Sequence, residues 1–171
     1  MTLFITTCKL NTIEDAVGNQ EVILDHSTGP TEQVYFCADD QKTLKTKEVG
    51  SQAFFKALRE SGQKGELKHI LLYVHGFNMS PFVVLDQTRE IQKAVNLMCG
   101  EPTLIVPIIW PCVKQGRTTA QYFTDRTSAD MSAVAISRAI SMFRRFMLDQ
   151  WKQTSGSKNP LCGTSVHILA H

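Results

Sequence analysis

The chain has 171 residues, of which 43% are hydrophobic and 20% are charged, with a net charge of +2. This length predicts one domain with a sizeable core, and the mild charge excludes the clustered lysines and arginines typical of a nucleic-acid-binding surface. No apolar run reaches the roughly 18 residues of a membrane span and no signal peptide opens the chain, so we expect a cytoplasmic protein.

The first part of the chain, residues 1–66, predicts two strands and a short helix. The β-branched run 3–10 and the run 32–39 predict the strands. A polar segment joins them, which predicts a loop with room for a short hairpin and allows the two strands to be antiparallel. Apolar residues at helical spacing predict a helix over 51–61.

The second part, residues 67–171, predicts a βαβαβ core. Continuous apolar runs predict strands, because a strand buried on both faces has no polar alternation. Between the strands lie two long segments with helical periodicity. Strands alternating with helices indicate an α/β protein with a mostly parallel sheet and helices on both faces. The strands are expected at 69–76, 102–111 and 165–171, and the helices at 78–100 and 124–151.

Several residues suggest where these elements begin and end. Ser80 is a preferred N-cap, Pro81 suits the first helical position and Gly100 suits a helix stop. A Thr-x-x-Asp spacing beginning at Thr127 favours the start of the next helix there or a few residues earlier. Pro107 interrupts an apolar strand and predicts a bulge or bend, because proline forfeits a ladder hydrogen bond.

The carboxyl end of strand 69–76 carries the first candidate site, because ligands in parallel sheets bind at carboxyl ends. His75 and Gly76 end this strand, and a glycine there allows close backbone approach. The N–H of Phe77 is then a candidate oxyanion-hole donor. Asn78 and Trp110 are candidates for the substrate pocket, although packing is the more common role of such a tryptophan.

Four motifs in order carry a resemblance to a known family: His75-Gly76-Phe77-Asn78, Trp110-Pro111, Asp125 with Ser128-Ala129, and His167-Ile168-Leu169-Ala170-His171. From about residue 67 to its end, the chain resembles a serine-esterase-like family of α/β hydrolases, mainly bacterial proteins of uncharacterised function. The resemblance implies an incomplete α/β-hydrolase fold of about five strands. It departs at Ile109, where the family usually has a serine before Trp-Pro.

The resemblance also implies a reaction and the place of the nucleophile. Family members attack an ester or similar small acyl substrate with a serine, through an acyl-enzyme. That serine is expected immediately after His171, and the acid and catalytic histidine later still. The oxyanion hole falls on His75, Gly76 and the Phe77 N–H. The chain then represents the N-terminal portion of a serine hydrolase, without a catalytic residue and inactive as given.

Other interpretations have less support. The chain can instead be a shortened, non-catalytic interaction module that self-associates through the exposed edge of its last strand. A nucleotide-binding protein is disfavoured because no phosphate-binding glycine motif follows a strand. Cys112 has no visible histidine partner as a nucleophile, and His167 with His171 make a weak metal pair. Five widely spaced cysteines argue against disulfides and structural zinc, so we expect no metal and no cofactor.

Overall fold

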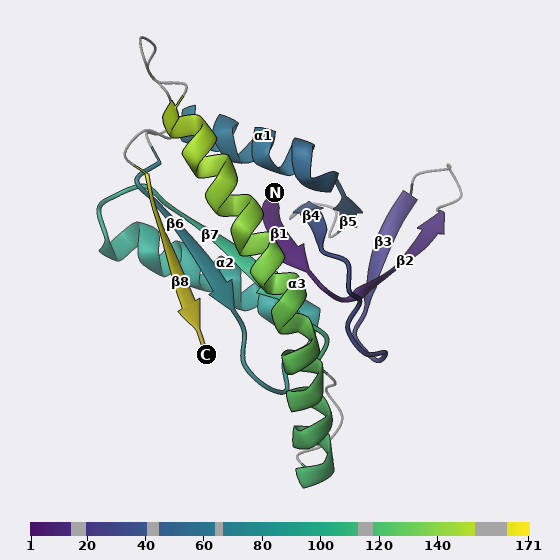
Figure 1. The fold of residues 1–171 in the computed structure, drawn as a ribbon. Coiled ribbons are helices and arrows are strands. Elements are labelled where there is room, and N and C mark those ends of the chain that lie inside the picture. Colours follow the sequence, from purple (N-terminus) through teal and green to yellow (C-terminus); the bar gives the residue numbers. More distant parts are fainter. Residues whose placement is uncertain (15–19, 41–44, 64–66, 113–117, 153–163) are drawn as a thin grey trace.

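The computed structural model describes residues 1–14, 20–40, 45–63, 67–112, 118–152 and 164–171. This part of the chain forms a mixed sheet, a separate hairpin and three helices (Figure 1). The strands are β1 (Thr2–Thr6), β2 (Lys9–Glu14), β3 (Gln20–Asp25), β4 (Tyr35–Asp40), β5 (Lys45–Glu48), β6 (His69–Val74), β7 (Thr103–Ile109) and β8 (Ser165–Ala170). The helices are α1 (Gly50–Gln63), α2 (Pro81–Met98) and α3 (Thr119–Lys152).

The main sheet has six strands in the order β5-β4-β1-β7-β6-β8. Strands β1, β7, β6 and β8 run parallel, whereas β4 and β5 pair antiparallel at the other edge. The prediction of an α/β fold with a mostly parallel sheet is therefore confirmed, including the antiparallel relation of the two opening strands. The sheet has one strand more than expected, because β5 adds to the edge.

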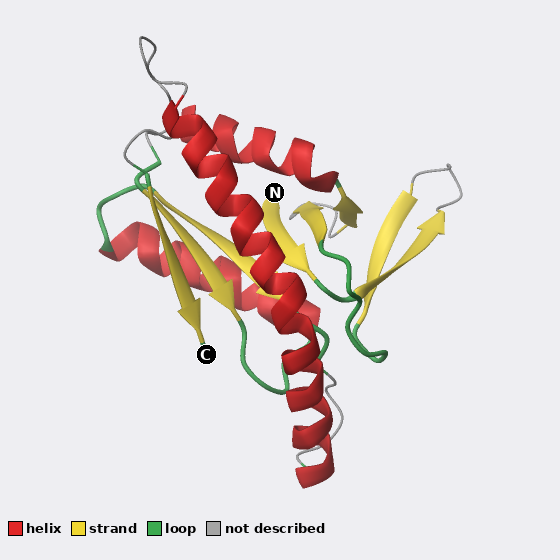
Figure 2. Ribbon diagram, in the orientation of Figure 1, coloured by secondary structure: helices red, strands yellow, loops and turns green. Residues whose placement is uncertain are grey.

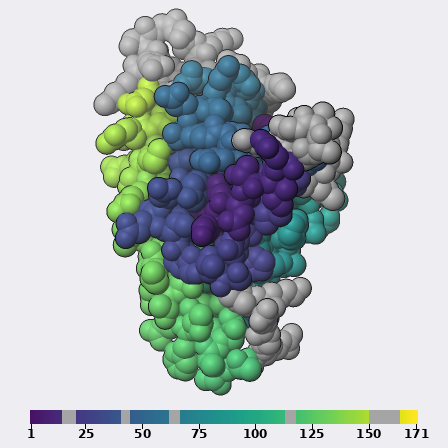
Figure 3. All heavy atoms as spheres, turned by 90° about the vertical axis from the view of Figure 1, so that its right-hand side faces the viewer, coloured from purple at the N-terminus to yellow at the C-terminus, as the bar shows by residue number. Residues whose placement is uncertain are grey.

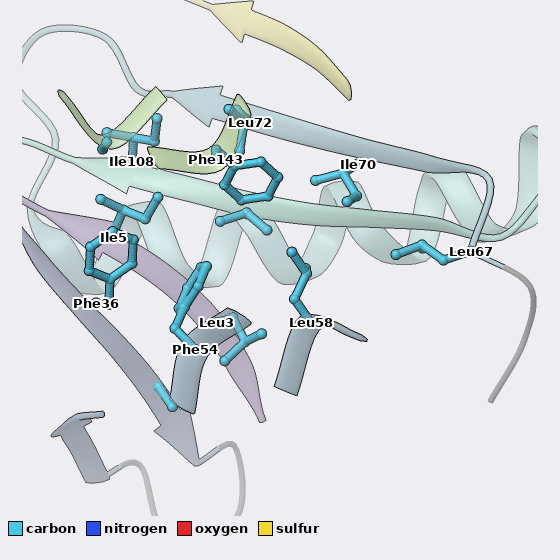
Figure 4. Packing of buried hydrophobic residues seen from close by; sticks show 13 residues of the cluster. Leu3, Ile5, Phe36, Phe54, Leu58, Leu67, Ile70, Leu72, Ile108 and Phe143 are labelled. Atoms are coloured by element: carbon cyan, nitrogen blue, oxygen red, sulfur yellow. The ribbon is translucent and has the colours of Figure 1, made fainter. Parts of the chain in front are cut away.

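Helices cover both faces of the sheet, as expected. Figure 2 shows α1 and α3 on one side and α2 on the other. Residues alternate between the two faces along β6: Ile70 and Leu72 pack in the cluster beneath α1 and α3, while Tyr73 packs in the cluster beneath α2. Figure 4 shows Phe143 of α3 among the residues of the first cluster. The sequence of β6 is apolar on both faces because a helical layer covers each face of the sheet.

The N-terminal region has the hairpin for which the prediction left room, but its first strand is shorter than predicted. The run 3–10 is divided: β1 ends at Thr6, and residues from Lys9 onward form a hairpin of β2 with β3. The break has a local cause, since the Thr6 hydroxyl accepts the Cys8 N–H at 3.0 Å and the Thr7 N–H donates to Ile109 O at 3.0 Å. Figure 3 shows this N-terminal part, purple to violet, on the near face.

The third helix begins earlier than expected. It starts at Thr119, and the Thr127 hydroxyl donates to a carbonyl one turn back, inside the helix. The N-cap is Thr118, whose hydroxyl accepts the Gln121 N–H at 3.2 Å. A Thr-x-x-Gln spacing, the signature of a capping box, therefore stands at the true start.

The ends of α2 match the prediction in position. Pro81 begins the helix, and Gly100 follows it with a positive φ of 62°. Ser80 occupies the N-cap position with extended backbone, but its side chain makes no capping hydrogen bond.

Pro107 causes no bulge, contrary to expectation. The register of β7 against β6 continues through it without a shift. Pairing with β1 begins only at the next residue, Ile108, so the missing N–H falls outside that ladder.

The last strand, β8, is less buried than its apolar sequence suggests. It pairs with β6 on one side and forms the edge of the sheet on the other. Three of its large apolar side chains are substantially exposed: Val166 (38%), Ile168 (55%) and Leu169 (45%). Within the described residues, no element covers this edge.

Candidate functional site

The carboxyl ends of β6 and β7 are joined by His75 and Trp110. Both residues are buried, and their rings stack with centroids 5.0 Å apart. His75 Nδ1 lies 2.8 Å from Gly76 O, and His75 Nε2 lies 3.1 Å from Trp110 O and 3.2 Å from Trp110 N. With hydrogen on Nδ1, the ring donates to Gly76 O and accepts the Trp110 N–H, whereas with hydrogen on Nε2 it donates to Trp110 O. Burial lowers the pKa of His75, which favours the neutral ring.

The end of β8 lies against Gly76. The His171 N–H donates to Val74 O at 3.1 Å, which continues the ladder past β8. A Cβ atom on Gly76 would lie 2.3 Å from His171 Nδ1 and 3.2 Å from His171 O. Position 76 therefore requires glycine in this arrangement, for the close backbone approach that the sequence suggested. Two motifs almost a hundred residues apart meet here.

Phe77 follows at the surface, with 38% of its area exposed. Its ring contacts Tyr122 of α3 edge-on, with centroids 5.5 Å apart. Within the described part of the chain, the Phe77 N–H makes no hydrogen bond, as an oxyanion-hole donor in an unliganded site would require. Asn78 has a positive φ of 60°, a left-handed conformation that asparagine tolerates better than most residues. Its buried Oδ1 has no hydrogen-bond partner.

Cys112 anchors this loop, a role that sequence reasoning missed. Its Sγ accepts the N–H groups of Asn78 at 2.8 Å and Met79 at 3.4 Å. The same thiol donates to Asp125 Oδ2 at 3.0 Å, and Gln121 Nε2 donates to Asp125 Oδ1 at 3.0 Å. Burial, followed by the hydrogen bond to Asp125, raises the pKa of Cys112 to about 12. A neutral thiol that donates to a carboxylate is a structural link and a poor nucleophile.

Trp110 also lines a cleft beside α3. Its role in a substrate pocket stays a prediction. The cleft has a volume of about 350 Å³ and is mainly apolar. Asn78, the other pocket candidate, is not among the residues that line this cleft. The remaining lining residues are Val74, Ala129, Ala133, Ile136, Ser137, Ile140 and Ser141.

His167 and His171 are not brought together. His171 lies against Gly76, whereas His167 Nε2 lies 2.8 Å from Ser165 Oγ near the other end of β8. In the described ranges, no group of three or more His, Cys, Asp or Glu side chains is arranged to hold a metal ion.

None of the described helices has the length and apolar character needed to cross a membrane.

Comparison with known proteins places the chain in a family. Residues 51–150, which make up 100 of the 171 residues, match the family model described as an alpha/beta hydrolase of unknown function (DUF900). The chain belongs to this family. The DUF900 match contains the loop after β6, together with Trp110, Cys112 and Asp125, and it ends before β8. No curated protein and no solved structure was found to match the chain.

Proposed function

We propose that the chain is the N-terminal portion of a serine hydrolase, esterase-like or lipase-like, that acts on a small ester or acyl substrate. The observation that carries the proposal is the position of His171 against Gly76, one residue from the unbonded Phe77 N–H. A serine placed after His171 would enter the turn beyond β8 beside this donor. Membership of DUF900 supports the hydrolase-like domain.

The role assigned to the described residues is to stabilise negative charge in the transition state. The serine gives its proton to the catalytic histidine expected later in the protein and attacks the acyl carbon. The carbonyl oxygen becomes an oxyanion that accepts a hydrogen bond from the Phe77 N–H. Such a donor acts best at 2.7–3.1 Å from the oxyanion and contributes about 10²–10³ in kcat in well-studied cases. His75 is not the general base in this scheme, because both of its ring nitrogens face backbone groups in a buried position. It holds the loop in place.

Three measurements test the proposal. The purified 171-residue chain should not turn over p-nitrophenyl esters above background, since it lacks a nucleophile. The coding sequence after codon 171 should specify Ser-x-Gly, in frame or after one shift, and the longer product should label with a fluorophosphonate at that serine. Ester turnover by the 171-residue chain that a single substitution abolishes would contradict the proposal, as would a longer product that does not label.

The second candidate is an interaction module that works through the edge of β8. The observation that favours it is the exposure of Val166, Ile168 and Leu169 on an unpaired edge strand. An uncovered apolar edge is a template for pairing with another chain. A stop codon after residue 171 that recurs in independent isolates, with a compact dimer in solution, would favour this function over the hydrolase.

A further inference from the structure

A second polar cluster lies where β6 and β8 begin, at the opposite end of these strands from the candidate active site. His69 Nδ1 lies 2.6 Å from Ser165 Oγ, and His167 Nε2 lies 2.8 Å from the same oxygen. The two imidazole nitrogens are 3.4 Å apart. The register pairs His69 with Ser165 and Leu71 with His167, so the three polar side chains share the face on which α2 packs.

Glu101 completes the cluster from the turn after α2. Its Oε2 lies 2.6 Å from His69 Nε2. A carboxylate in this position holds the ring hydrogen on Nε2, which leaves the Nδ1 lone pair directed at the cluster. The two histidine rings are inclined by 51°, with centroids 5.4 Å apart, so they meet at their edges.

Ser165, His69 and Glu101 form a hydrogen-bonded row that resembles a catalytic triad. The surroundings of the serine do not support acyl transfer. An oxyanion hole needs free N–H donors beside the serine. The Ser165 N–H already donates to Lys68 O at 2.8 Å, and the His69 N–H donates to Pro102 O at 3.2 Å. The nearest backbone donors are therefore used in the sheet and the turn that precedes it.

We propose that His69 Nδ1 and His167 Nε2 chelate a divalent transition-metal ion of the zinc class. Two nitrogens bound at about 2.0–2.1 Å around a tetrahedral ion are about 3.3–3.4 Å apart, and the observed separation is 3.4 Å. Water completes the coordination, because the site is open to solvent. The Ser165 hydroxyl, 2.6 and 2.8 Å from the two nitrogens, is too close to them to be a ligand of the same tetrahedral ion and must turn away when the ion binds. Glu101 acts on the outer side of His69, in the carboxylate–histidine–metal arrangement that orients such ligands.

The chemistry of the donors selects the ion. Neutral imidazole suits zinc, nickel and copper, whereas magnesium and calcium require oxygen ligands. His167 presents its Nε2 lone pair by carrying its hydrogen on Nδ1, and the Ser165 hydroxyl can rotate to suit. No covalent step or proton release is needed when both imidazoles are neutral.

Such an ion would also link two strands. His69 lies on β6 and His167 on β8, the edge strand of the sheet. An ion that binds the folded chain and not the unfolded one stabilises the fold by mass action. The inferred consequence is a metal-dependent attachment of β8 to β6, at the end of the strand opposite His171.

Calorimetric titration of the chelator-treated 171-residue chain with Zn²⁺, and separately with Ni²⁺, tests the proposal. We expect one saturable site for each ion and no binding of Mg²⁺. The variants His69→Gln and His167→Gln should each lose at least about tenfold in affinity, and Glu101→Gln about 10–100-fold. His26→Gln removes a histidine in the loop after β3 and should bind like the wild type.

Folding of the variants is checked by circular dichroism, and the site is located by imidazole nitrogen NMR shifts. Zn²⁺ should perturb His69 and His167. It should raise the thermal midpoint of the wild type but not of the double variant that carries both His69→Gln and His167→Gln. The proposal is wrong if the wild type binds no Zn²⁺ or Ni²⁺. It is equally wrong if the folded double variant binds as tightly as the wild type, since the ion is then held elsewhere.

Discussion

The imidazole of His75 and the indole of Trp110 are almost parallel, with 4° between their planes. Trp110 Nε1 donates to His75 O at 2.9 Å, and the Trp110 N–H reaches His75 Nε2. One pair of residues thus joins the carboxyl ends of β6 and β7 by stacking and by hydrogen bonds in both backbone and side chain. The loop that carries the Phe77 N–H begins at this junction.

Trp110→Phe should destabilise the protein by about 1–3 kcal/mol, because the buried His75 carbonyl loses its donor. Urea denaturation followed by far-UV circular dichroism measures the loss. Tyr122→Phe, at a half-exposed position, is the matched control and should change stability by no more than about 0.5 kcal/mol. Equal losses in the two variants would show that the indole hydrogen bond contributes little.

Stability should fall on acidification because the pKa of His75 is lowered by burial from its usual value of 6.5. Below about pH 6.5 the unfolded chain binds a proton at this residue and the folded chain does not, so the free energy of unfolding decreases, by at most about 1.4 kcal/mol per pH unit. In His75→Gln this contribution disappears and the slope between pH 6.5 and 5 flattens. An unchanged slope would mean that His75 is protonated in the folded state.

Gly76→Ala should release the end of β8 from the sheet. The new methyl group would lie 2.3 Å from the His171 side chain, which must rotate away. Hydrogen exchange at the amides of Ala170 and His171 should become faster, while amides in β7 should change little. Adding His171→Ala removes the closest clash and should restore part of the protection. Without any restoration, the clash with His171 is not the cause.

The buried thiols should resist alkylation in the native protein. Burial raises the pKa of Cys8, Cys37 and Cys112 to about 12, so little thiolate forms at pH 8. Iodoacetamide should label Cys99, which is exposed, and reach the other three only after unfolding. Cys162 lies outside the described residues and is replaced by serine for this experiment. Rapid native labelling of Cys112, detected by mass spectrometry, would argue against its position between Asn78 and Asp125.

Ile168→Lys should reduce any self-association through β8. The side chain is 55% exposed on an edge strand, and a lysine there opposes pairing with a second chain. Sedimentation velocity over a range of concentrations compares it with the wild type. Val134→Lys, on the exposed surface of α3, adds the same charge away from the edge and should behave like the wild type. If both variants dissociate alike, the effect comes from net charge.

The sequence by itself determined the elements whose signals are local. Apolar runs predicted β6 and β7, and Pro81 with Gly100 predicted the ends of α2, because burial and capping act within a few residues of the chain. The resemblance of four short motifs also indicated the α/β-hydrolase fold. The Thr-x-x-Gln spacing at the start of α3 is also local, but a similar spacing nine residues later competes with it in the sequence.

Only the tertiary structure decided which of these residues meet. His171 lies against Gly76, and Cys112 joins Asn78 to Asp125, because strand order and helix placement bring separate segments to one edge of the sheet. The exposure of β8 likewise depends on its edge position, since an apolar run has the same sequence at the centre or the edge. Local propensity has no term for contacts across 96 residues, such as that between His69 and Ser165.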